Sequence, residues 1–203
     1  STPLYSSAAS DVYKRQILSM AQKRGIKTLA LTDINNTSAS LDFVRMAPKY
    51  NIKPVLGVDF RNNGIQQFII LAQNNNGFQQ INTYLSNLTS TQMSHIPEQA
   101  KTLEDTVVIY PYTKCQHFKL KNNEFLGVNT KHINQLEYSK ASLNINKIVI
   151  LHTCSFRNKK DFNTHRLLRA IDQNTLLSKL SVNAQGQATD LYTDEKLIQR
   201  KFT

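Results

Sequence analysis

The sequence predicts an α/β protein in which parallel strands alternate with helices. Short apolar runs of strand length recur along the 203 residues, and the stretches between them carry apolar residues at helical spacing. Strands that alternate with helices in this way usually pair in parallel and are joined by crossover helices. Two of the apolar runs, 27–31 and 54–60, carry an aspartate at or just beyond their carboxyl ends, which is where α/β barrels place their chemistry.

The expected strands are short and mostly apolar. The first, 27–31, is followed by a polar turn over 33–38. The second and third are separated by Asn62-Asn63-Gly64, a tight-turn signal, so 55–72 is expected to form an antiparallel hairpin. The complete set of expected strands is 27–31, 55–60, 67–72, 106–110, 125–128 and 147–152.

The expected helices have apolar residues three or four positions apart. Residues 17–25 are expected to end a helix at Gly25, because glycine commonly closes helices. Pro48 lies inside the helical pattern of 41–50 and is expected to kink that helix or end it early. The other helical patterns are 78–88, a short helix at 97–103, 133–136, 161–171 and a short segment near 195–200.

The first sixteen residues differ from the rest of the chain. They show neither helical nor strand periodicity, and Asp11–Gln16 is similar to a translation of the transposon end sequence used in preparing sequencing libraries. Segments of foreign origin are excluded from fold reasoning. We therefore expect 1–16 to be a non-native or disordered leader, and a strand that would precede Ile17 to be missing.

The charge balance is strongly basic. There are 25 Lys and Arg residues against 14 Asp and Glu, which gives a formal net charge of +11. The cations are densest in 157–179, where a surface facing phosphates or an acidic partner is one interpretation and diffuse charge for solubility is the other. The candidate phosphate or partner contacts are Arg157, Lys159, Lys160, Arg166 and Arg169.

Other classes of site find less support in the sequence. No apolar run approaches the roughly 18 to 20 residues that span a bilayer, so we expect a cytoplasmic protein without membrane contact. Cys115 and Cys154 lack metal-like spacing and are expected to be reduced thiols without a catalytic His/Asp constellation. His95, His117 and His132 lie in polar stretches without a partner at ligand spacing.

Four sequence blocks, taken together, point to a known family. In order they are AQKRGIKTLALTDINNTS, APKYNIKPVLGVDFRN, FIILAQNNNGFQQIN and SFRNKKDFNTHRLLRAIDQNTLLSKL. In this order and at these separations they resemble the PHP (polymerase and histidinol phosphatase) domain that opens the alpha subunit of bacterial replicative DNA polymerase III. The stretch ALTDINNTS is similar to the Bacteroidetes-type branch of that family, and the resemblance covers Ile17 to Leu180.

The resemblance implies a distorted seven-stranded β/α barrel, similar to a TIM barrel. We expect this barrel to be incomplete, because its first strand is missing from the chain. The implied organisation is a leader at 1–16, a PHP-type barrel domain at 17–180, and a polar tail at 181–203 that leads toward absent polymerase domains.

Active members of the family hold up to three metal ions, and the resemblance implies that this chain has lost most of the ligands. Ile34 stands where the family has a histidine, and Thr153 and Ser155 stand at a late ligand pair. Asp33 and Asp59 remain as vestigial positions, although such ions need dense His/carboxylate clusters. We therefore expect no metal ion, cofactor or catalytic residue in this fragment, and Asp33 and Asp59 to cap strand-to-helix turns.

The leading functional hypothesis is an N-terminal fragment of the polymerase alpha subunit, which would be a structural and partner-binding module that is inactive alone. The resemblance implies a parent DNA-directed DNA polymerase, a nucleotidyltransferase of DNA replication. It would use Mg in its palm domain, contact DNA, and dock the proofreading exonuclease and other replicase subunits. The first alternative is a free-standing metal-dependent phosphoesterase similar to histidinol phosphatase. The second is a nucleic-acid-binding module, supported only by charge.

Overall fold

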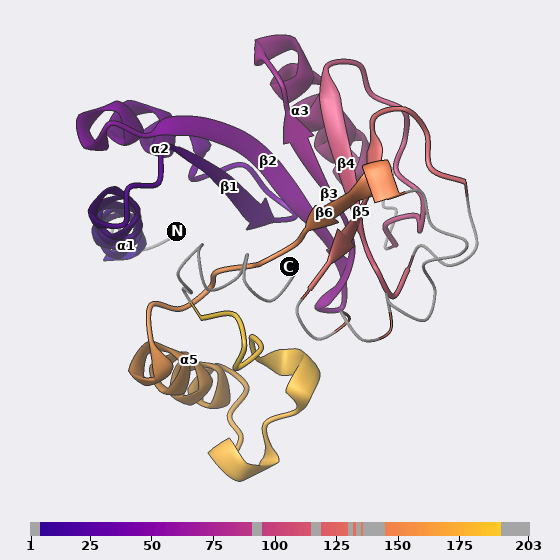
Figure 1. The fold of residues 1–203 in the computed structure, drawn as a ribbon. Helices are drawn as coiled ribbons and strands as arrows, with labels where there is room; N and C mark the ends of the chain where they lie inside the picture. The colour runs from indigo at the N-terminus through magenta and orange to yellow at the C-terminus, as the bar shows by residue number, and fades with distance from the viewer. Residues whose placement is uncertain are drawn as a thin grey trace. The chain divides into compact units, whose positions relative to one another are not determined.

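The computed structural model describes residues 5–90, 95–114, 119–129, 132, 135 and 145–191. Within these residues the fold is mixed α/β, with four α-helices and six strands that hydrogen-bond in the order β1-β2-β3-β4-β5-β6 (Figure 1). The α-helices are α1 (Tyr5–Lys23), α2 (Ser40–Met46), α3 (Asn75–Ser90) and α5 (Lys159–Asp172). The strands are β1 (Thr28–Ile34), β2 (Lys53–Asn62), β3 (Ile65–Ala72), β4 (Thr106–Pro111), β5 (Glu124–Val128) and β6 (Ile148–Ile150). The short 3-10 helices whose bounds are described are η1 (Ala47–Tyr50), η3 (Ile145–Lys147), η4 (Leu177–Lys179) and η5 (Val182–Ala184).

The chain divides into two compact units, and each is described by itself. The first unit comprises 1–62, 66–110 and 117–125, and the second comprises 63–65, 111–116 and 126–203. Asp33 and Asp59 therefore belong to the first unit, whereas the basic segment belongs to the second.

The strand predictions are confirmed at all six places where a strand was expected. β6 is shorter than its predicted range of 147–152, since it covers only Ile148–Ile150. The α/β class is confirmed, and the sheet is compatible with part of a barrel. The expectation of parallel pairing holds for β1–β2 and β5–β6 but is wrong for β3–β4, which pairs antiparallel, so the sheet is mixed. The seven-stranded, TIM-like barrel and its incompleteness stay predictions.

The helix predictions are confirmed in part. α2 ends at Met46 and is followed by the 3-10 turn η1, which contains Pro48, so the early end is confirmed. The short helix predicted at 97–103 is wrong: this segment is irregular, and the Ala100 N–H donates to the Tyr110 hydroxyl at 3.0 Å. Apart from Gln135, the predicted helices at 133–136 and 195–200 lie outside the described residues.

The predicted leader contains part of a helix. α1 begins at Tyr5, so 5–16 are helical where irregular structure was expected, and Ala, Lys, Arg and Gln in this stretch are good helix formers. The Lys14 side chain is buried, and its Nζ donates to Asp42 Oδ2 on α2 at 3.0 Å. The non-native origin of 1–16 and the boundaries of the three predicted domains stay predictions.

The helices of the first unit cover one face of the β1–β2 pair. These strands are parallel, and their register runs from Thr28↔Lys53 to Ile34↔Asp59. Side chains alternate between faces along a strand, so the β2 residues 56, 58 and 60 share a face. On that face Leu29, Leu31 and Leu56 pack against the buried residues of α1, α2 and their flanks, which are Leu18, Ala21, Phe43, Ala47 and Ile52.

The same face continues into an aromatic cluster beneath α3. Phe60 lies 5.0 Å from Phe68 and 5.5 Å from Tyr84, measured between ring centroids, and Phe68 lies 5.9 Å from Tyr110. All four rings are buried, and burial raises the pKa of the Tyr84 hydroxyl. The helix-covered face of the sheet therefore lies against the core of this unit. Residues 57 and 59 point to the opposite face of the sheet.

The predicted hairpin joins β2 to β3 and is confirmed. Its two-residue turn consists of Asn63 and Gly64, whose φ angles of 47° and 82° lie in the left-handed region. Such a turn matches the twist of the flanking strands. The hairpin carries β3 back along β2 and returns Gln66 to the neighbourhood of Asp59.

Candidate functional site

Asp33 and Asp59 lie on opposite faces of the β1–β2 pair. The register pairs Asp33 with Val58, on the helix-covered face, and pairs Ile34 with Asp59, on the other face. Paired residues of neighbouring strands point to the same side of a sheet. The two acids predicted as vestigial metal positions are therefore not brought together.

Asp33 organises the turn between β1 and α2. Its Oδ2 accepts the N–H of Ala39, the residue directly before α2, at 3.2 Å. An acceptor at this point satisfies one of the N–H groups that a helix start leaves unpaired. The capping role predicted for Asp33 is confirmed.

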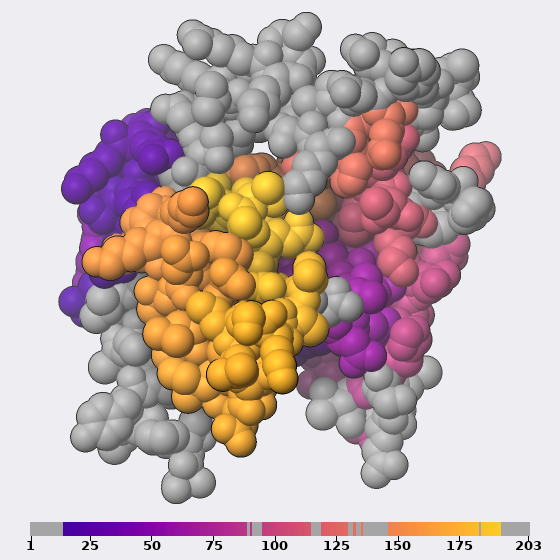
Figure 2. Space-filling view, turned by 90° about the horizontal axis from the view of Figure 1, so that it is seen from below, coloured from indigo at the N-terminus to yellow at the C-terminus, as the bar shows by residue number. Residues whose placement is uncertain are grey.

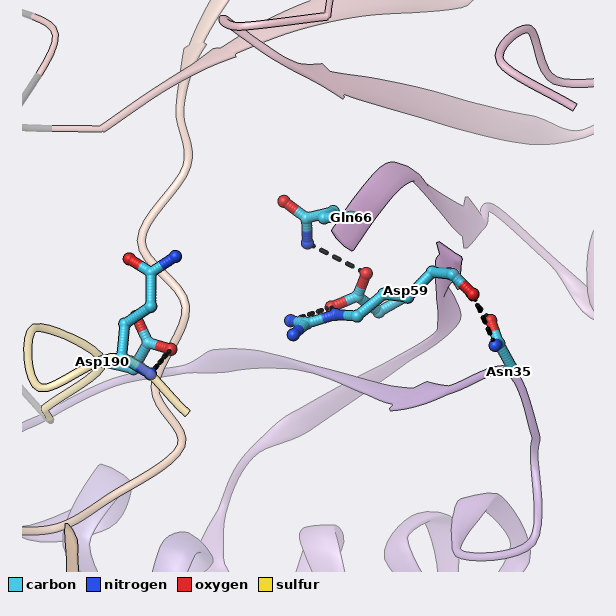
Figure 3. A network of polar contacts seen from close by, with 6 residues as sticks. Asn35, Asp59, Gln66 and Asp190 are labelled. Atoms are coloured by element: carbon cyan, nitrogen blue, oxygen red, sulfur yellow. Dashed lines mark hydrogen bonds and ion pairs between the residues drawn. The ribbon is translucent and has the colours of Figure 1, made fainter. Parts of the chain in front are cut away.

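Asp59 is buried, with both carboxylate oxygens engaged by side chains of the hairpin. Oδ2 accepts from Arg61 Nε at 2.9 Å and from Arg61 Nη2 at 2.6 Å. Oδ1 accepts from Gln66 Nε2 at 2.9 Å, and these contacts converge on Asp59 in Figure 3. The Asp59 side chain is 3% exposed and that of Arg61 is 20% exposed. The capping role predicted for Asp59 is wrong, because its partners are side chains of β2 and β3.

Asn35 fixes the backbone on both sides of this ion pair. Its N–H donates to the Asp59 carbonyl at 3.1 Å, its Nδ2 donates to the Arg61 carbonyl at 2.8 Å, and its Oδ1 accepts the Arg61 N–H at 2.8 Å. Asn35 adopts a left-handed φ of 52°, which asparagine tolerates better than most residues. The asparagine thus extends the β1–β2 pairing past the last paired residues and holds Arg61 in place.

The residues at this site do not fit the metal centre that the family resemblance implies. Ile34 shares the face of Asp59 but has no side-chain atom that can bind a metal, and the carboxylate oxygens of Asp59 accept from Arg61 and Gln66. A divalent ion would have to displace a guanidinium from a buried carboxylate. Within the part of the chain that the structure describes, no three His, Cys, Asp or Glu residues are placed to hold a metal ion.

A shallow cavity lies beside the turn that follows β1. Its volume is about 470 Å³, and its lining mixes polar and apolar surface without a charged residue. The lining residues are Asn35, Asn36, Thr37, Asn82, Leu85, Ser86 and Ser90. Without a charged group, this cavity offers amide and hydroxyl hydrogen bonds but no electrostatic attraction for a phosphate or a metal ion.

In the second unit, the basic segment forms the start and one side of α5. Asn158 caps the helix, since its Oδ1 accepts the Asp161 N–H at 3.0 Å. Arg157 donates to both carboxylate oxygens of Asp161, at 2.5 and 3.0 Å, and lowers the pKa of that carboxyl. Lys159 and Lys160 are exposed in the first turn of α5. Figure 2 shows one face of α5 and of the segment that follows it, in orange to yellow.

The two later arginines hold α5 to the segment that follows it. Arg166 Nε donates to Gln185 Oε1 at 2.6 Å, and Arg169 Nε donates to the Ala184 carbonyl at 2.9 Å. Arg169 also pairs with Asp172 at 2.8 Å. Of the five predicted phosphate contacts, the three arginines therefore have intramolecular partners, and a phosphate-facing role for the five stays a prediction.

His165 packs and hydrogen-bonds within the second unit. Its ring lies 5.2 Å from that of Phe156, and its Nε2 accepts the Gly186 N–H at 3.2 Å. Burial lowers the pKa of His165, and the nearby charge of Arg169 lowers it further. A Cβ at Gly186 would lie 2.7 Å from the Phe156 ring, so glycine is required for this close approach.

Sequence reasoning missed Arg61 and Gln66 as site residues. The signal was present, because positions 59 and 61 of a strand point to the same side and a two-residue turn brings the next strand back alongside. An acid and an arginine at this spacing predict an ion pair when the strand is buried.

Comparison with known protein families gives a match that lies almost entirely within the first unit. The family model described as PHP domain matches residues 3–110, which include Asp33, Asp59 and Arg61. The matched range ends at Tyr110 in β4 and begins within the predicted leader. No curated protein matches the chain. Within the described residues, no helix is long and apolar enough to cross a membrane.

Proposed function

Because the chain belongs to the PHP domain family, we propose that it is a non-hydrolytic PHP domain from the alpha subunit of a bacterial replicative DNA polymerase III. In this role it supports the neighbouring polymerase domains and offers a docking surface to the proofreading exonuclease subunit. The domain itself carries no cofactor, and the parent polymerase supplies Mg-dependent nucleotide addition and most of the DNA contact. A cytoplasmic location follows from a role in bacterial replication.

The main support for a non-hydrolytic role is that Arg61 and Gln66 bind the Asp59 carboxylate. Phosphoester hydrolysis in this family needs metal ions that activate water and bind the phosphate oxygens. The carboxylate best placed to bind such an ion is held by Arg61 and Gln66, and its strand neighbour is Ile34. Because no metal-binding group of His, Cys, Asp or Glu is found among the described residues, scaffolding and binding roles fit this chain best.

The observation that supports the polymerase assignment is the block from Ser155 to Leu180, which lies beyond the matched range. Its helix α5 carries the asp-x-x-x-his-x-x-leu pattern at Asp161, His165 and Leu168 that resembles the polymerase branch. Lys159 and Lys160 are exposed at the start of this helix and provide a basic surface for DNA or for an acidic neighbouring domain.

A free-standing metal-dependent phosphoesterase is the second candidate, because the family also contains phosphatases and this chain keeps acids at Asp33 and Asp59. The two candidates differ in what surrounds the coding sequence of this chain. If the polymerase assignment is correct, sequencing the native locus will show an open frame that continues for hundreds of residues and encodes palm-domain aspartates. A stop codon close behind this segment, with a native first strand that carries His-x-His, would contradict the assignment and favour the phosphatase.

A further inference from the structure

We infer that the Arg61 guanidinium is the built-in cation of this PHP site and performs the charge-balancing role that metal ions perform in metal-loaded domains. This inference rests on the proposed non-hydrolytic function. It assigns to Arg61 a task that the family match does not assign, namely to make the fold independent of a metal ion. Removing Arg61 should uncover a cation requirement that the intact chain does not have.

Burial makes a positive partner necessary. A buried carboxylate is costly unless it is paired and hydrogen-bonded, and losing the partner of a buried ion pair is strongly destabilising. Asp59 is 2% exposed as a residue, and the Arg61 Nη2–Asp59 Oδ2 distance of 2.6 Å is that of a short, charge-assisted hydrogen bond. Gln66 satisfies Oδ1 but brings no charge, so the compensation of charge falls to Arg61.

The chemistry of arginine suits a permanent substitute for a metal ion. Its guanidinium stays protonated at any physiological pH, and its planar fork places two N–H groups on Asp59 Oδ2 at once. A lysine would keep the charge but not this fork. The position is also fixed, because Asn35 bonds both the N–H and the carbonyl of Arg61.

Without the Arg61 guanidinium, the site would offer carboxylate oxygens as ligands for a metal ion. Asp59 would keep a carboxylate whose Oδ2 is free and whose Oδ1 still accepts the Gln66 amide, and its negative charge would have lost its partner. Carboxylate and carbonyl oxygens favour hard divalent ions such as Mg²⁺ and Mn²⁺. Removal of Arg61 should therefore turn a metal-independent site into one that responds to Mn²⁺.

The test compares thermal unfolding of the full chain and its Arg61→Ala variant, with and without MnCl2 as the probe. The MnCl2 concentration is about 10 mM, so that it exceeds a weak Kd tenfold. We expect Arg61→Ala to lower Tm by about 10 °C, as the loss of a buried ion pair predicts. Mn²⁺ should raise the Tm of this variant by at least about 3 °C and leave that of the wild type unchanged. An Arg61→Ala variant as stable as the wild type, or one without a Mn²⁺ response, would overturn the inference.

Three further variants separate charge balance from packing. Arg45→Ala removes a cation from an exposed position on α2 and should leave Tm unchanged. Arg61→Lys should lose less Tm than Arg61→Ala, because it keeps the charge. The double variant Asp59→Asn with Arg61→Ala should regain Tm and lose the Mn²⁺ response.

The double variant also keeps the test decisive when Arg61→Ala does not fold. A folded double variant then supports the inference, and an unfolded one contradicts it. Failure of the proposed function has a separate signature, which is a Mn²⁺-dependent rise of Tm in the wild type itself.

Discussion

Replacing Phe60 with alanine should lower the free energy of unfolding by about 3–5 kcal/mol, the usual cost of removing a large buried aromatic side chain. Phe60 is fully buried and contacts the rings of Phe68 and Tyr84, which join β2 to β3 and α3. It also lies between Asp59 and Arg61 and points to the opposite face, so it anchors the strand that presents the ion pair. Denaturant unfolding followed by circular dichroism measures the effect.

Leu41→Ala provides the matched control for Phe60→Ala. Leu41 is 67% exposed on α2, and alanine is a good helix former, so this change should alter stability by less than about 0.5 kcal/mol. Equal effects of the two substitutions would show that the aromatic cluster is not the core of the first unit.

Gly57→Ala should destabilise the protein by about 3 kcal/mol, the upper end of the cost of overpacking a core. A Cβ at Gly57 would lie 2.4 Å from the Ile70 carbonyl oxygen and 2.7 Å from a methyl group of Leu71. The nearer atom belongs to the backbone of β3, so it cannot move without disturbing the strand pairing. Thermal unfolding of the variant measures the loss.

The control for Gly57→Ala is Lys53→Ala, which changes an exposed side chain at the start of the same strand. It should change Tm by no more than about 2 °C. A Gly57→Ala variant as stable as this control would mean that β2 and β3 are further apart than the structure places them.

The segment that contains Gly57 and Phe60 shows how far the sequence could predict the fold. The strand at 54–60 was expected from its apolar run, and the turn after it from Asn62-Asn63-Gly64, because strand and turn signals are local. The requirement for glycine at 57 depends on a carbonyl of β3, and such close approaches follow from strand register, which periodicity alone does not supply. The irregular 97–103 segment has a related cause, since a contact to Tyr110 overrides its weak helical pattern.

The candidate site was predicted less well than the fold. Asp33 and Asp59 were expected at the ends of two strands, but Asp59 lies inside β2, which continues to Asn62, and the parallel register places the two acids on opposite faces. Their roles also differ, because Asp33 accepts a backbone N–H before α2 whereas Asp59 binds a guanidinium. For the basic segment, the residue types were evident from the sequence, but the intramolecular partners of Arg166 and Arg169 come from a loop some fifteen to twenty residues later.

The central claim is that an internal ion pair stands where this family's hydrolytic centre would bind metal. The most direct test is the metal content of the purified full chain after dialysis against Mn²⁺ and Zn²⁺ and removal of free ions, measured by elemental analysis. We predict well under one equivalent of either metal per chain, and the same result for Asp59→Ala. One tightly held equivalent in the wild type that is lost in Asp59→Ala would contradict the claim.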